Sequence, residues 1–119
     1  MSINELIQQA VEPLVPVCVP GTYTGKNPRY ITFAVLSVPD EYGDDEPEAI
    51  RHHITLHYIS PLVDTPPKGS PQVVCRELCK ALHRAGFSWP TVMDSADLEV
   101  RDCILECEYV EGLVLDGSL

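Results

Sequence analysis

The cysteines are the first residues in this sequence whose type and spacing could support chemistry. Cys75 and Cys79 lie one helical turn apart in a segment with helical periodicity, so their thiolates could share a metal ion. Cys103 and Cys107 have the same spacing on an expected strand, where four residues span about 13 Å, so that pair cannot bind one ion by itself. A zinc site would need one strand cysteine and a further ligand. Since free cysteine is among the most buried residue types, we expect apolar core residues instead.

Histidines 52, 53 and 57 could also bind a metal or move protons. Their segment, IRHHITLHYIS, is typical of a strand, on which His53 and His57 share a face about 13 Å apart while His52 faces the opposite side. The helical H-x-x-x-H zinc motif is therefore not available to them. We expect cross-strand or intersubunit partners, such as Thr32 or an acidic side chain.

An acidic segment over residues 40–48 is the third candidate. It contains Asp40, Glu41, Asp44, Asp45, Glu46 and Glu48. The spacing is not that of an EF-hand, although loose calcium binding is an alternative. The segment is either a solvated loop or an acidic functional surface. No nucleophile elbow, phosphate-cradling glycine loop or H-E-x-x-H motif occurs, so we predict no catalytic residues, no cofactor and no enzymatic activity.

Length and charge narrow the class of protein. A chain of 119 residues is expected to form one domain over 1–119. With 18 acidic and 8 basic side chains, its net charge of −10 repels the nucleic-acid backbone, so DNA is not an expected binding partner. The acidic side chains either keep the protein soluble or form a surface past which DNA moves without adhering. We predict no secretory signal and no membrane span, and a reduced, intracellular environment.

Two helices are expected to position these residues. Ser2, with Glu5 three residues later, has the spacing of a capping box. This cap precedes a helix whose apolar stripe consists of Ile3, Leu6, Ile7, Ala10, Val11 and Leu14. Prolines 13 and 16 are expected to end that helix. The second helix follows Ser70 and Pro71, runs over residues 72–85, and stops at Gly86.

Strands are expected near residues 17–19 and over 29–38, 50–60 and 102–111, with a short strand within 87–95 that begins after Pro90. Pro39 is expected to end the first long strand. The order α-β-β-β-α-β-β predicts an α+β fold with an antiparallel sheet and two helices packed on one face.

Side-chain alternation assigns the two faces of the sheet. Ile31, Phe33 and Val35 in one strand, and Ile54, Leu56 and Tyr58 in the next, are expected in the core. The other face has the mixed character of a subunit contact, with Thr32, Leu36, Thr55, His57 and Ile59. In the last strand, Ile104, Glu106, Glu108 and Val110 share one face and the cysteines the other.

Three segments together resemble the tail-completion (tail terminator) proteins of long-tailed bacteriophages and prophages. They are NELIQQAVEPLVPV leading to YITF, then EYGDDEP before a strand, and KALHRAGFSWP followed by ILECEYVE. The resemblance extends from Ile3 to about Glu111. It rests on short segments and not on a catalytic motif.

The resemblance implies a small α+β subunit of the virion, made in the host cytoplasm, that forms a ring, typically a hexamer, at the head-proximal end of the tail. Its partners would be copies of itself, the tail tube protein and the head–tail connector or neck proteins, with DNA only as passing cargo. By this analogy the acidic segment 40–48 lines the lumen or docks on tube or neck. A head–tail joining protein, an acidic DNA mimic or regulatory module, and a zinc-stabilised module are the alternatives.

Overall fold

The structure is a computed structural model that describes residues 1–43, 46–61, 71–96 and 100–112. Within them, its elements are α1 (Ile3–Val11), β1 (Cys18–Pro20), β2 (Tyr30–Gly43), β3 (Glu46–Pro61), α2 (Pro71–Arg84), β4 (Thr91–Ala96) and β5 (Val100–Gly112). The α+β class and the element order predicted from the sequence are confirmed. None of the described helices is long and apolar enough to cross a membrane.

The strands form one sheet in the order β1-β2-β3-β5-β4. Three neighbouring pairs are antiparallel: β2 with β3, β3 with β5, and β5 with β4. The exception is β1, which pairs with β2 in parallel, from Cys18 opposite Ile31 to Pro20 opposite Phe33. The expected antiparallel sheet is therefore a mixed one, because the connector after β1 returns the chain to the end of the sheet from which β1 started.

The central hairpin is longer than the sequence predicted. The pairing of β2 with β3 continues from Tyr30 opposite Ile59 to Gly43 opposite Glu46. The prediction that Pro39 ends the first strand is wrong, since Pro39 lies within β2 opposite Ile50. Beyond Phe33 the outer edge of β2 pairs with no other described strand, and proline is tolerated at such an edge because no sheet hydrogen bond is lost there.

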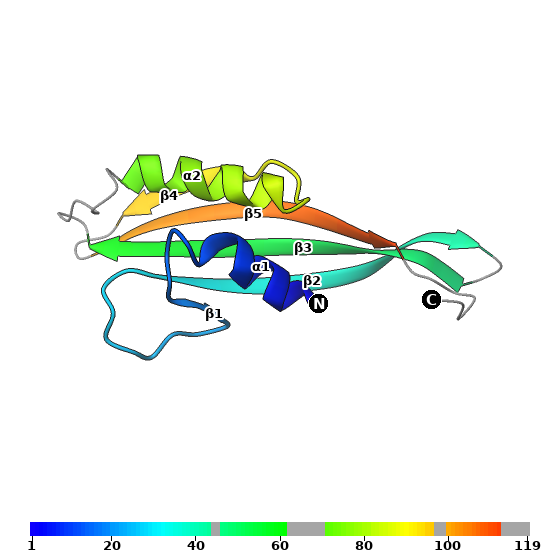
Figure 1. Ribbon diagram of the computed structural model, residues 1–119, viewed down its shortest axis with the longest axis horizontal. Helices are drawn as coiled ribbons and strands as arrows, with labels where there is room; N and C mark the ends of the chain where they lie inside the picture. The colour runs from blue at the N-terminus through cyan, green and yellow to red at the C-terminus, as the bar shows by residue number, and fades with distance from the viewer. Residues whose placement is uncertain (44–45, 62–70, 97–99, 113–119) are drawn as a thin grey trace.

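The core lies between the sheet and both helices. The predicted inward residues of the hairpin are buried, with Ile31, Phe33, Ile54, Leu56 and Tyr58 at most 2% exposed and Val35 partly buried against them. They share one cluster with residues of both helices, such as Ile7, Val11, Leu78 and Leu82. Both helices therefore pack on the same face of the sheet, as predicted (Figure 1).

The first helix has the predicted N-terminal cap. The Glu5 backbone N–H donates to Ser2 Oγ at 3.1 Å, and the Ser2 hydroxyl lies 3.3 Å from Glu5 Oε1. The cap satisfies one of the amide donors that the first turn leaves without a partner.

Replacing Ser2 by alanine is expected to destabilise the protein by about 1 kcal/mol, because that amide loses its acceptor. Urea unfolding of Ser2→Ala measures the change. The exposed Ser95→Ala variant on β4 is the control and should unfold like the unchanged protein. Equal destabilisation of both variants would contradict the role of the cap.

The second helix ends at Arg84, one residue before the predicted Ala85, and Gly86 provides the predicted left-handed stop with a φ of 103°. The closing hydrogen bonds run from the Gly86 N–H to the His83 carbonyl and from the Phe87 N–H to the Leu82 carbonyl, each at 3.1 Å. This turn directs the chain from α2 back toward the sheet edge, where β4 begins.

All the cysteines are buried, as the core interpretation predicted. The sequence analysis did not predict that Cys75 of α2 and Cys103 of β5 form a disulfide. Alternation along β5 turns Cys103 toward the helices, and α2 places Cys75 above it. Cys18, Cys79 and Cys107 are free thiols.

Candidate functional site

One face of the sheet is turned away from both helices (Figure 1). We call it the open face, and no described helix covers it. Its side chains alternate with those of the core along the strands β2, β3, β5 and β4. This surface is the candidate functional site.

The residues predicted as a subunit contact lie together on the open face. Thr32 is opposite His57 in the β2–β3 pairing, and Ile59 and Thr55 are on the same face of β3. Thr32, Thr55, His57 and Ile59 line one hollow of about 400 Å³. Leu36 lies farther along β2 and is 64% exposed. Their shared face is confirmed, while their contact with another subunit stays a prediction.

The connector between β1 and β2 forms one wall of this hollow. The Tyr23 ring packs on the Tyr30 ring with centroids 4.5 Å apart, and its hydroxyl accepts a hydrogen bond from the Asn27 N–H at 2.9 Å. The Arg29 N–H in turn donates to Asn27 Oδ1 at 3.0 Å. Gly25 lies against the Tyr23 ring, where any side chain would collide with it. The wall is thus an ordered part of the site.

The clustered histidines pair with carboxylates of β5. On the open face, His53 Nδ1 lies 3.1 Å from a Glu108 oxygen, and His57 Nδ1 lies 3.0 Å from the Asp102 carboxylate. His52 faces the opposite side, as predicted, and contacts Ser37 at 2.6 Å and Glu111 at 2.9 Å. The expectation of cross-strand acidic partners is confirmed. These contacts fix the histidines in place as links between strands.

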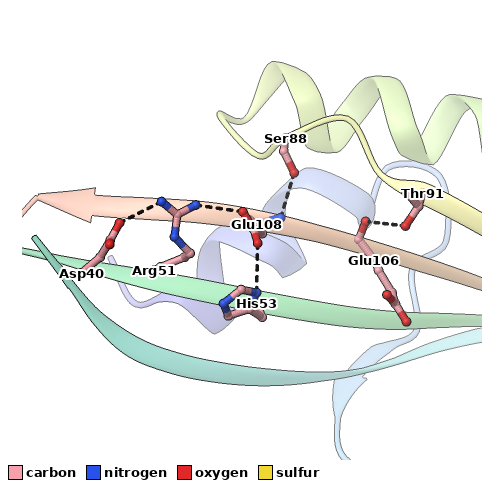
Figure 2. Close-up of polar contacts among 7 residues, drawn as sticks. All are labelled: Asp40, Arg51, His53, Ser88, Thr91, Glu106 and Glu108. Carbon is pink, nitrogen blue, oxygen red and sulfur yellow. Dashed lines mark hydrogen bonds and ion pairs between the residues drawn. The ribbon is translucent and has the colours of Figure 1, made fainter.

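Arg51 joins three strands through its guanidinium, as Figure 2 shows. It donates to Asp40 of β2 at 2.8 Å and to Glu108 of β5 at 2.9 Å. The hydrogen bond to Asp40, followed by that to Glu108, raises the pKa of Arg51 above its usual value. Because Glu108 also contacts His53, the four side chains form one network on the open face.

Glu106 has no ion-pair partner among the described residues and is exposed. Its carboxylate points away from the Arg51 network (Figure 2). It borders a second hollow, of about 290 Å³, whose lining includes Trp89, Thr91 and Glu108. Thr91 and Ser88 hold this edge in place: Thr91 Oγ1 donates to the Glu106 carbonyl at 3.4 Å, and the Glu108 N–H donates to Ser88 Oγ at 2.9 Å.

The open face is therefore acidic. In the described part of the chain it carries Asp40, Asp102, Glu106 and Glu108, against the single guanidinium of Arg51. The sequence analysis placed Glu106 and Glu108 on one face of the last strand but missed Arg51 and Asp102 as their neighbours. Alternation was the available signal, but the pairing of β3 with β5 was needed to join the two sets.

The acidic segment 40–48 was predicted to be a loop, but most of its acidic residues belong to strands. Asp40 lies on the open face, bound to Arg51. Glu41 belongs to β2, and Glu46 and Glu48 belong to β3. Asp44 and Asp45 lie outside the described residues. The segment is mostly the end of the hairpin and not a free loop, since β2 and β3 remain paired up to Gly43 and Glu46.

The cysteines are poor candidates for chemistry. Burial raises the pKa of Cys18 and of Cys107 to about 12, so both thiols remain protonated near neutral pH. Within the described ranges, no group of three or more histidine, cysteine, aspartate or glutamate side chains is arranged to hold a metal ion.

Comparison with known proteins adds no family to these observations. No protein-family model matches the sequence, and no curated protein is significantly similar to it.

Proposed function

We propose that this protein is a structural subunit that assembles with copies of itself, and that the assembly caps the head-proximal end of the tail tube of a long-tailed phage and helps to join tail to head. The observation that carries the proposal is the open face. It is a broad, ordered sheet surface with exposed apolar side chains such as Leu36 and Met93, and no described helix covers it. Such a surface is typical of one that meets another protein.

The charge of the whole protein supports the same proposal. A subunit with a net charge of −10 repels the phosphates of passing DNA, so that DNA moves through the assembly without adhering. The proposed location is the virion, and the proposed partners are the tail tube protein and the neck proteins, as the resemblance of the sequence implies.

The test combines native mass spectrometry with electron microscopy of tail tubes incubated with the protein. We expect rings, most simply hexamers, and tubes closed at one end. Leu36→Asp should abolish rings without unfolding, because it places a charge on the open face, whereas Gln9→Asp on exposed α1 should not. A protein that forms no rings and leaves tubes uncapped would refute the proposal.

An acidic DNA mimic is the second candidate, favoured by the distribution of carboxylates over a face and not within one loop. Arg51 contacts Asp40 and Glu108, and His57 contacts Asp102, so these three carboxylates already have partners within the protein. Glu106 alone among them lacks an ion-pair partner in the described residues. Tight, salt-sensitive binding to a DNA-binding protein would support the mimic, and its absence would favour assembly.

A further inference from the structure

The outer face of α2 is basic in a protein that is otherwise strongly acidic. Arg76, Lys80 and Arg84 recur every four residues and so lie on one side of the helix. They are three of the eight lysines and arginines in the whole sequence. The buried residues Leu78 and Leu82 lie on the opposite side, which turns the basic stripe away from the core.

The charges of this stripe are largely free to interact. Lys80 pairs with Glu77 at 3.2 Å, and both side chains are about two-fifths exposed. Arg76 and Arg84 are exposed and form no ion pair with any described residue. The stripe therefore offers a partner two guanidinium groups that have no ion pair within the described part of the chain.

The basic stripe and the open face lie on opposite sides of the molecule. The helices pack on one face of the sheet, and the acidic side chains project from the other (Figures 1 and 2). Both surfaces also carry exposed apolar groups: Leu36 and Met93 on the open face, at 64% and 65%, and Val73 on α2, at 45%. Each surface thus has the chemistry that complements the other.

We propose that α2 of one copy of this protein packs against the open face of the next copy. This proposal rests on the self-assembly proposed above and names the two surfaces that meet. The contact brings Arg76 and Arg84 to the carboxylates, and the hollow beside Glu106 and Trp89 receives one of the basic side chains. A carboxylate and an aromatic ring together are a favourable environment for a guanidinium group.

The charge pattern also excludes contacts in which two copies meet through the same surface. Two open faces in contact would oppose carboxylate to carboxylate, and two α2 helices would oppose arginine to arginine, both of which are costly. A contact between different surfaces is heterologous, and its repetition around an axis closes a ring when the rotation allows it. The partner that the open face fits is thus a second copy of this chain.

A charge-swap experiment tests the contact. Arg76→Glu and Glu106→Lys should each weaken self-association about tenfold or more at low salt, because each places like charges opposite one another. Lys26→Glu, on the exposed connector, and Glu12→Lys, at the end of α1, change the net charge by the same amounts and should have little effect. Sedimentation velocity measures association, and circular dichroism verifies that each variant is folded.

The decisive result is rescue. The chain that carries both Arg76→Glu and Glu106→Lys should associate again, as should an equimolar mixture of the two single variants, because opposite charges again face each other. Unchanged association of both single variants, or no rescue, overturns the contact between α2 and the open face. If rings persist in those variants, this contact is wrong and the proposed capping function still stands. If the unaltered protein never associates, this contact is also wrong, and the tail-tube assay alone then decides whether the protein caps tubes.

Discussion

Replacing Leu56 by alanine is expected to lower the free energy of unfolding by about 3 kcal/mol. Leu56 is fully buried at the centre of the sheet, between Phe33 on one neighbouring strand and Leu105 on the other. Its loss leaves a cavity, because residues of a paired sheet cannot move together to fill it. In a domain of this size the melting temperature should fall by roughly 10 °C, which differential scanning calorimetry measures.

Leu36→Ala is the matched control, since it removes the same atoms from the opposite face of the same hairpin. Leu36 is 64% exposed, so the expected change is within about 0.5 kcal/mol. Equal destabilisation by the two variants would show that the assignment of the core face and the open face is wrong. The comparison should be made at a concentration at which the protein is monomeric.

Reduction of the disulfide is the second change with a large expected effect. Cys75 and Cys103 are separated by 28 residues in the sequence, so their bond restricts the unfolded chain and should stabilise the protein by about 3 kcal/mol. Adding a reductant should therefore lower the melting temperature by roughly 10 °C. The double variant Cys75→Ala, Cys103→Ala should melt at a low temperature with or without reductant.

Thiol counting provides the control for this prediction. The denatured, unreduced protein should expose the three free thiols of Cys18, Cys79 and Cys107. In the folded protein Cys18 and Cys107 should react slowly with iodoacetamide at pH 8, because burial raises their pKa to about 12 and keeps them protonated. All five cysteines reacting in the denatured, unreduced protein would mean that the disulfide does not form.

Local signals in the sequence predicted much of the fold. Ser2 caps α1 and Gly86 ends α2, because each of these features depends on a few neighbouring residues. Alternation correctly placed Leu56 in the core and Thr32 on the opposite face. Pro39 failed as a stop signal because its effect depends on whether a strand lies beside it, which is a property of the sheet and not of the local sequence.

The candidate site was predictable only in part. The face that contains Thr55, His57 and Ile59 could be recognised from one strand. The bridge from Arg51 to Asp40 and Glu108 could not, because it joins residues 11 and 57 positions apart in the sequence. The same holds for the disulfide, because Cys75 and Cys103 are 28 positions apart and meet only when α2 packs on the sheet.

The sequence by itself determined the element order, the two helices with their ends, the division of the hairpin into two faces and the acidic character of the protein. Those features follow from periodicity, caps and composition, which act within a few residues or over the whole chain. The tertiary structure alone decided the parallel pairing of β1, the disulfide, the network around Arg51 and the placement of basic α2 opposite the acidic open face. These depend on which strands become neighbours, and that is set by the packing of the entire core.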